Sequence, residues 1–148
     1  MNPRLSYLIK WVERGIRSEL DAALRPVGVS TPEYTTLSVL RSRSGLSSAQ
    51  LARRAFVSGQ AMNQLVIAIE KRGWIERSAD PRHGKILRAT LTLKGAEVLR
   101  ACDKATAHVE KALLSQLTRE QAANLREALN ACADALSRAS GHAHELEP

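Results

Sequence analysis

The sequence predicts a mainly α-helical fold with one small β-hairpin. Three observations lead to this prediction. Apolar residues recur at helical spacing over most of the chain, the period changes to two between residues 74 and 92, and helix-starting signals precede several of the helical segments. The 148 residues include only two Trp, two Tyr and one Phe. The core must therefore be built mainly from Leu, Ile, Val and Ala, as in helical proteins.

Length and composition exclude several classes of protein. A chain of 148 residues is expected to form one domain or two closely fused lobes. No apolar run approaches the ~18 residues of a transmembrane helix, and the N-terminus lacks the apolar core of a signal peptide. Cys102 and Cys132 form one pair at most, in no metal or redox spacing. We therefore expect a cytoplasmic protein without membrane association, metal or cofactor.

The positive charge is concentrated in the middle of the chain. Residues 31–92 carry ten Lys and Arg against four Asp and Glu, whereas residues 93–148 carry seven against eight. A basic segment of this kind suits a polyanion such as nucleic acid, because each neutralised phosphate releases condensed counterions. The alternative is that the net charge of +7 only maintains solubility.

The first predicted helix covers residues 5–24. Its apolar stripe consists of Leu5, Leu8, Ile9, Val12, Ile16, Leu20 and Leu24. Tyr7, Trp11 and Arg14 lie on the opposite side, so the helix is either buried on two sides, one of them against a partner chain, or carries two partly exposed aromatics. Both interpretations stay open at this point.

A break at residues 25–29 precedes the second predicted helix. Thr31 is its predicted N-cap, Pro32 stands in its first turn, and Tyr34 contributes to its apolar face. Gly45 is the predicted stop signal, with arginines just before it.

Two capping signals then predict a helix-turn-helix. Ser47 and Gln50 have the spacing of a capping box and open a short helix, SAQLARRA. After a turn at residues 56–57, Ser58 is a suitable N-cap for a longer fourth helix. General helical hairpins share this pattern, so the segments on its C-terminal side decide its meaning.

The fourth predicted helix, Ser58–Gly73, organises the rest of the chain. One stripe is apolar, with Met62, Leu65, Val66 and Ile69. The neighbouring stripe carries Gln60, Asn63, Gln64 and Ile67. Side-chain amides place a donor beside an acceptor, which is the geometry that reads an adenine edge in the major groove. Taken alone, the same stripe would also fit an ordinary solvated helix face.

The period of two after Gly73 predicts a hairpin. Leu87, Ala89 and Leu91 alternate with polar residues, and residues 74–77 are the predicted partner strand. The connection, residues 79–85, contains proline, glycine and three potentially cationic side chains. A basic hairpin directly after a recognition helix is a wing, whose arginine can enter the minor groove. The alternative is an ordinary hairpin loop.

Two long helices are expected after the hairpin. Thr92 caps the fifth, and Thr118 and Gln121 form a capping box for the sixth. Their apolar residues follow heptad-like seams, which suit dimerisation or packing within one chain. The predicted organisation is a first helix for dimerisation (residues 1–30), a winged helix-turn-helix DNA-binding lobe (31–92), dimerisation helices (93–139) and a mobile tail (140–148).

These segments together resemble the MarR (multiple antibiotic resistance regulator) family of bacterial transcription factors. The resemblance covers roughly residues 5–136. Its most specific part is Gly73–Arg77 (GWIER), followed by Asp80–Lys85 (DPRHGK) and Leu91–Gly95 (LTLKG). Family members are winged helix-turn-helix homodimers that bind pseudo-palindromic operators, and many release DNA when a small aromatic or phenolic ligand binds.

The resemblance implies roles for particular residues. Those expected to contact DNA are Ser58, Gln60, Ala61, Asn63 and Gln64 on the recognition helix, Arg82 at the wing tip, and Arg77 and Lys85 as phosphate or wing-supporting contacts. Asp80 is expected to position the wing arginine by a charge-assisted hydrogen bond. Gln64 replaces an arginine found in many relatives, which leaves the operator sequence open. The candidate ligand pocket contains Trp11, Arg14, Tyr34 and His108, each equally explained as packing or surface.

The resemblance implies a homodimeric, sequence-specific DNA-binding repressor tuned by a small ligand. Both cysteines lie on apolar seams and are predicted to be inert core residues, and the four histidines form no metal cluster. A winged-helix protein–protein adaptor without an operator is the alternative. An enzyme is the third interpretation, and no nucleophile–base pair or glycine-rich phosphate loop supports it.

Overall fold

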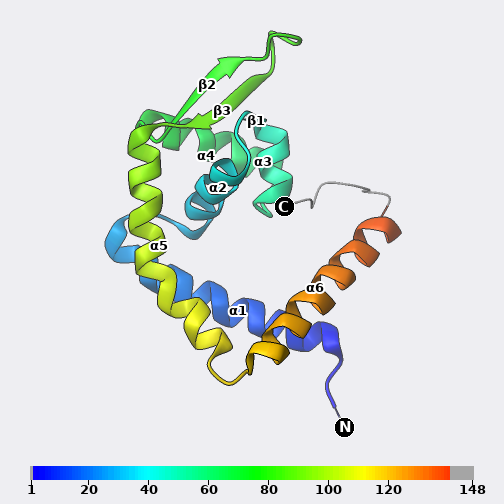
Figure 1. Cartoon of the computed structure of the whole chain (residues 1–148). Helices are drawn as coiled ribbons and strands as arrows, with labels where there is room; N and C mark the ends of the chain where they lie inside the picture. Colours follow the sequence, from blue (N-terminus) through cyan, green and yellow to red (C-terminus); the bar gives the residue numbers. More distant parts are fainter. Residues whose placement is uncertain (1, 141–148) are drawn as a thin grey trace. The chain divides into compact units, whose positions relative to one another are not determined.

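A computed structural model of the chain describes residues 2–140 (Figure 1). In chain order the helices and strands are α1 (Leu5–Leu24), the short 3-10 helix η1 (Arg25–Val27), α2 (Thr31–Ser42), β1 (Leu46–Ser47), α3 (Ser48–Arg54), α4 (Gly59–Lys71), β2 (Ile75–Ala79), β3 (Leu87–Leu91), α5 (Leu93–Leu114) and α6 (Arg119–Ala139). The predicted mainly helical fold with a hairpin wing is confirmed.

The described part of the chain forms two compact units, which divide between Val109 and Glu110. Helix α5 begins in the first unit and ends in the second. The predicted mobile tail lies outside the described residues, apart from Ser140. No helix within residues 2–140 is long and apolar enough to cross a membrane.

Local capping signals account for where most helices begin. The capping boxes predicted at Ser47 and at Thr118 are both present, with Gln50 and Gln121 as their partners. The predicted N-cap Thr31 is wrong by one residue. Ser30 caps α2 instead, because its hydroxyl accepts from the backbone N–H of Glu33 while the Glu33 carboxylate accepts from the Ser30 N–H.

The wing belongs to a three-stranded antiparallel sheet with the order β1-β3-β2. Strand β2 pairs with β3 from Ile75 opposite Leu91 to Ala79 opposite Leu87, as the hairpin prediction requires. The short strand β1 was not predicted. Its Leu46 pairs with Ala89, which attaches the wing to the loop in front of α3. The remaining part of the hairpin, residues 80–86, is the wing tip.

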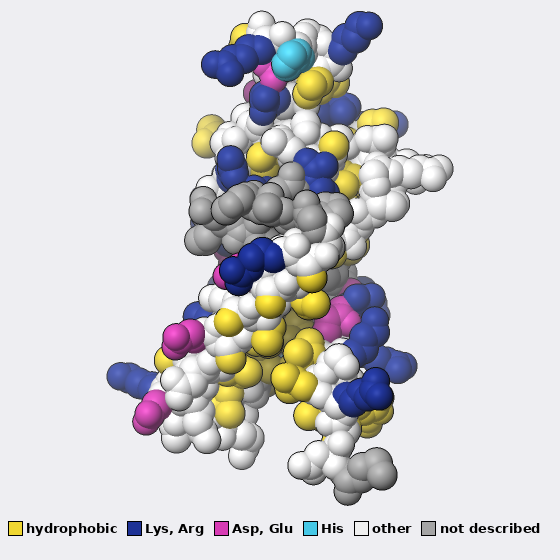
Figure 2. Space-filling view, turned by 90° about the vertical axis from the view of Figure 1, so that its right-hand side faces the viewer, with side chains coloured by type: hydrophobic (Ala, Val, Ile, Leu, Met, Phe, Trp, Pro, Cys, Tyr) yellow, Lys and Arg dark blue, Asp and Glu magenta, His cyan; other side chains and the backbone are white. Residues whose placement is uncertain are grey.

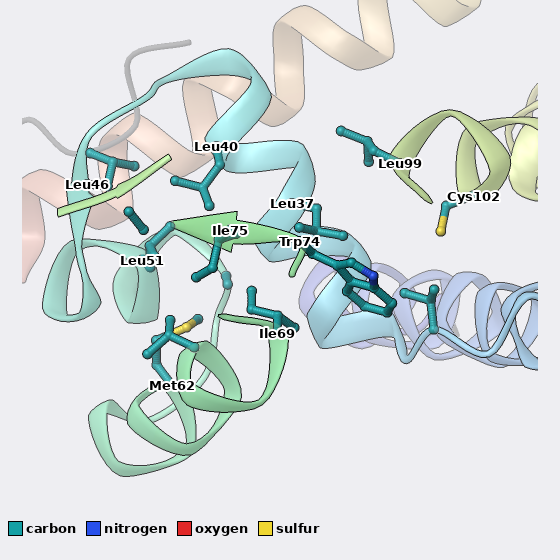
Figure 3. Close-up of a cluster of buried hydrophobic side chains, with 14 of the residues drawn as sticks. Leu37, Leu40, Leu46, Leu51, Met62, Ile69, Trp74, Ile75, Leu99 and Cys102 are labelled. Carbon is teal, nitrogen blue, oxygen red and sulfur yellow. The ribbon is translucent and has the colours of Figure 1, made fainter. Parts of the chain in front are cut away.

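Apolar side chains from almost every element of the first unit form its core (Figure 3). Met62, Val66 and Ile69, three of the four residues in the predicted apolar stripe of α4, are buried in it. Leu99 and Cys102 from α5 join the same core. The seam predicted on the fifth helix therefore serves, in this part, to pack the helix within its own chain.

A close backbone contact sets the start of α5. The Thr92 hydroxyl donates to the Gly73 carbonyl at 2.6 Å and accepts from the Gly95 N–H at 3.0 Å. A Cβ on Gly95 would lie 1.9 Å from the carbonyl oxygen of Trp74, so only glycine fits there. Thr92 and Gly95 thus explain why the LTLKG segment ends the wing and begins the helix.

Helices α1 and α6 leave most of their large apolar side chains in solvent. On α1 only Leu24 is fully buried, and both the predicted stripe and the side with Tyr7 and Trp11 are largely exposed. The rings of Tyr7 and Trp11 meet edge to face, with 5.8 Å between centroids. On α6 no residue is buried. Its exposed apolar residues include Leu125, Leu129 and Leu136.

Candidate nucleic-acid interface

Helix α4 separates its apolar side from its polar side. Met62, Val66 and Ile69 anchor the helix in the core, whereas the DNA-contacting residues predicted on α4 and at its N-cap are all exposed. These residues are Ser58, Gln60, Ala61, Asn63 and Gln64. The structure therefore brings together the polar stripe expected on the recognition helix. The opposite side of this helix is buried in the core.

The start of α4 is fixed by Ser58. Its hydroxyl accepts from the backbone N–H of Ala61 at 3.1 Å, as an N-cap does. Two residues earlier, Phe56 has a φ of +59°. A left-handed conformation costs a residue with a Cβ about 1 to 2 kcal/mol, and the Phe56 side chain is nevertheless 83% exposed. The turn between α3 and α4 is therefore strained at a residue whose ring is not used in the core.

Asn63 is oriented by a neighbour that the sequence did not identify. The hydroxyl of Ser48, the first residue of α3, donates to Oδ1 of Asn63 at 2.6 Å. This bond holds the amide plane and leaves both Nδ2 protons and the second lone pair of Oδ1 for a base edge. Asn63 can thus still make the two hydrogen bonds that recognise adenine.

The wing tip is organised by Asp80, which is only 4% exposed. Its Oδ1 accepts from the backbone N–H of Arg82, and its Oδ2 accepts from Nε of Arg88, both at 2.8 Å. The Arg82 N–H and the Arg88 guanidinium hold the pKa of Asp80 below its usual value. The expected charge-assisted hydrogen bond to the wing arginine is present and is made through the backbone N–H of Arg82, whereas the ion pair of Asp80 is with Arg88.

Arg77 links the wing to the recognition helix. Its Nε and Nη2 donate to the two carboxylate oxygens of Glu70 on α4, at 3.1 and 3.0 Å. The Arg77 hydrogen bonds lower the pKa of Glu70. Because this bidentate pair uses the fork of the guanidinium, the geometry favours wing support over phosphate contact for Arg77.

The wing tip presents basic side chains to solvent. Arg82, His83 and Lys85 are all exposed. Figure 2 shows Lys and Arg side chains around the upper end of the view, where Figure 1 places the wing. The basic hairpin connection predicted from the sequence is thus exposed, on the same lobe as the polar stripe of α4.

The candidate pocket residues differ in their surroundings. The Tyr34 hydroxyl donates to Oδ1 of Asp103 at 2.7 Å and accepts from Thr106 at 3.3 Å, which joins α2 to α5. Arg41 forms an ion pair with the same carboxylate, and its hydrogen bond is the main cause that lowers the pKa of Asp103. Burial raises the pKa of Tyr34. Sequence reasoning had no signal for this cluster, because Arg41 and Asp103 are far apart in the chain.

The other three candidates, Trp11, Arg14 and His108, are exposed. The Trp11 ring contacts Tyr7, and the Tyr34 hydroxyl binds Asp103 on α5. Among residues 2–140 these contacts do not join the four candidates into one cluster. Their assignment to a pocket remains a prediction.

The prediction that both cysteines are core residues is confirmed for Cys102 and wrong for Cys132. Cys102 is buried, and burial raises the pKa of its thiol. Cys132 is exposed, like the rest of α6, which has no buried residue. Among residues 2–140, no group of three or more His, Cys, Asp or Glu is placed to hold a metal ion.

Comparison with known proteins gives consistent matches. The profile of the MarR family matches residues 27–86. The chain is 38% identical over 117 residues to the HTH-type transcriptional repressor Rv2887 of Mycobacterium tuberculosis, covering 79% of this chain and 84% of the relative.

Solved structures agree with this result. The structure of Rv2887 in complex with DNA shares 33% identity, with a TM-score of 0.71 and coverage of 88% of this chain and 98% of that one. The complex of Rv2887 with salicylic acid shares 34% identity, with a TM-score of 0.73 and coverage of 88% and 97%. Apo MarR from E. coli has a TM-score of 0.77 at 21% identity, covers 89% and 98%, and shows the common fold.

Proposed function

This chain belongs to the MarR family, and from that premise we propose that it is a homodimeric, sequence-specific DNA-binding repressor. A small aromatic or phenolic ligand would release it from a pseudo-palindromic operator. The proposal includes no catalysis and no cofactor. A regulator that binds the bacterial chromosome acts in the cytoplasm, which is where we place this protein.

One observation carries the DNA-binding part of the proposal. Helix α4 exposes an amide-rich stripe while its apolar side is buried, and the basic wing tip belongs to the same lobe. Phosphate contacts would supply much of the affinity, and Asn63 and Gln64 much of the sequence choice. In a two-fold dimer the recognition helices would enter major grooves about 10 bp apart, with Arg82 in the flanking minor grooves.

Exposed apolar surface supports the homodimer. Taken by itself, α1 exposes Leu5, Leu8, Ile9 and Val12 beside two aromatics, and α6 exposes its own leucines. Apolar rows of this length are uncommon on monomeric proteins and mark interfaces. A second copy of the chain is the proposed partner, since a two-fold interface uses the same surface on both subunits.

The ligand part of the proposal rests on the relative. Rv2887 has been crystallised with salicylic acid and with p-aminosalicylic acid. We propose that small aromatic acids of this kind also bind here, near Trp11, Arg14, Tyr34 and His108. A cationic Arg14 and the ring of Trp11 offer a carboxylate and a phenyl group the contacts they need.

A gel shift with fragments of the source genome at two salt concentrations tests the function. Specific binding should weaken steeply with salt and should be reversed by added salicylate. Arg82→Ala should weaken binding and reduce the salt slope by about one, whereas Arg138→Ala on α6 should change neither. An adaptor without an operator would shift no fragment, and that result would refute the proposal.

A further inference from the structure

Phe56 combines two properties that rarely occur together. It lies in the turn between α3 and α4, its φ is +59°, and its side chain is 83% exposed. Among residues 2–140, Phe56 is the only residue other than glycine with a positive φ. A large apolar side chain in solvent and a backbone conformation that disfavours any Cβ both destabilise the folded protein.

Nothing in the turn itself requires phenylalanine. Glycine adopts a φ of this kind without steric cost, and it is the usual residue where a turn needs one. The neighbouring Val57 is the turn residue that packs against the core, so the core does not depend on Phe56. Strain retained at an exposed side chain indicates that this side chain has a contact outside the folded lobe.

The neighbours of Phe56 indicate what that contact is. Arg53 and Arg54 form the last turn of α3 just before it, and the exposed Ser58 and Gln60 begin α4 just after it. An exposed aromatic residue that stands in the chain between arginines and the polar start of a recognition helix suits DNA, whose groove edge alternates phosphates with apolar sugar and methyl groups.

We propose that Phe56 is a DNA-contacting residue whose ring packs on an apolar group at the edge of the major groove. That group is either a thymine C5-methyl or a deoxyribose, which share the same apolar chemistry. The inference rests on the proposed function, and it adds a contact outside the polar stripe of α4. The turn thus trades stability for DNA affinity at this residue.

Phe56→Gly and Phe56→Ala test the inference on the duplex that the wild-type protein selects from a randomised pool. Phe56→Gly should raise the melting temperature, because the strain is relieved, and should still weaken binding roughly five- to twentyfold. The salt slope should stay at the wild-type value, since no phosphate contact is lost. Leu93→Ala, which removes another highly exposed apolar side chain, should change neither property.

A second arm identifies the apolar group. Replacing each thymine of the duplex by uracil removes the methyl groups. A loss of affinity seen with wild type and absent with Phe56→Ala assigns the thymine methyl, whereas equal affinity for both duplexes assigns the sugar.

The inference is overturned if Phe56→Gly binds as tightly as wild type, or if its weaker binding is accompanied by loss of the dimer in size-exclusion chromatography. If the wild-type protein itself selects no duplex, the proposed function fails, and that outcome differs from a Phe56 variant that binds normally.

Discussion

Asp80 and Arg88 form an ion pair across the hairpin at the base of the wing tip, with one residue on each side of the hairpin. Arg88 also donates from Nη1 to the Gly45 carbonyl at 2.8 Å, which ties the hairpin to the loop in front of β1. The second oxygen of the same carboxylate holds the backbone of Arg82. One buried carboxylate therefore fixes both Arg88 at the base of the wing tip and the backbone at the start of the tip before any DNA is bound.

Asp80→Asn should loosen the wing and weaken DNA binding about tenfold, equivalent to roughly 1.4 kcal/mol. The amide can still accept from the Arg82 N–H, but its NH₂ group would meet the donors of Arg88. Fluorescence anisotropy with the selected duplex measures the loss, and circular dichroism checks that the helices persist. Asp134→Asn on α6 is the matched control. An unchanged dissociation constant for Asp80→Asn would refute the role of the ion pair.

Asn63→Ala should change the preferred base at one position of the operator and cost about 1 to 3 kcal/mol of binding free energy. Ser48→Ala should broaden the preference at that same position, because the amide is no longer held by the 2.6 Å hydrogen bond. Ser48→Thr keeps the hydroxyl and should restore selectivity. Selection from a randomised pool measures all three variants. Recovery of the wild-type motif with Asn63→Ala would show that Asn63 does not read bases.

Asp103→Asn should make the free energy of unfolding less dependent on pH in the acidic range. The pKa of Asp103 is lowered in the folded protein, mainly by the Arg41 hydrogen bond and also by that of Tyr34. Its contribution is therefore present above the unfolded value of about 3.9 and is lost as pH falls through the lower folded value.

Urea unfolding at several pH values measures this contribution. The variant should be less stable than wild type by about 0.5 to 1 kcal/mol near neutral pH, since the pair is partly exposed. The difference should shrink below about pH 4. A difference that stays constant into acid would show that the charge of Asp103 is not its cause. Asp134→Asn should show no such difference at any pH.

Local signals made the helices predictable. A capping box such as Ser47 with Gln50 depends on a spacing of three residues, so it can be recognised without knowing the fold. The same is true of the two faces of α4, since helical periodicity alone separates Met62 from Asn63. The MarR resemblance then implied roles for particular residues of the wing and the recognition helix.

Features that depend on distant residues could not be predicted. Arg88 occupies a strand position that alternation assigns to the solvent side, and only the folded hairpin places it against Asp80 and Gly45. The two residues of β1 are too few to produce a period. The predicted burial of Cys132 failed for a different reason: a seam of apolar residues does not specify whether its partner lies in the same chain.

Gly95→Ala should destabilise the first unit strongly, because Gly95 is the glycine in residues 2–140 at which an added Cβ would clash with backbone. The new Cβ would lie 1.9 Å from the Trp74 carbonyl oxygen, and backbone cannot move aside as a flexible side chain can. Overpacking of this kind costs about 1 to 3 kcal/mol, and here it would also disturb the hydrogen bond between Thr92 and Gly73.

Urea unfolding followed by tryptophan fluorescence should show a lower midpoint for Gly95→Ala, because Trp74 is buried beside the contact. Gly84→Ala in the wing tip is the control, since a Cβ there meets nothing within 4 Å and should change stability by less than about 0.5 kcal/mol. If Gly95→Ala unfolded at the wild-type midpoint, the approach of α5 to the Trp74 carbonyl would have to be looser than 1.9 Å implies. The coupling of the wing to the start of α5 through Thr92 would then lose its steric basis.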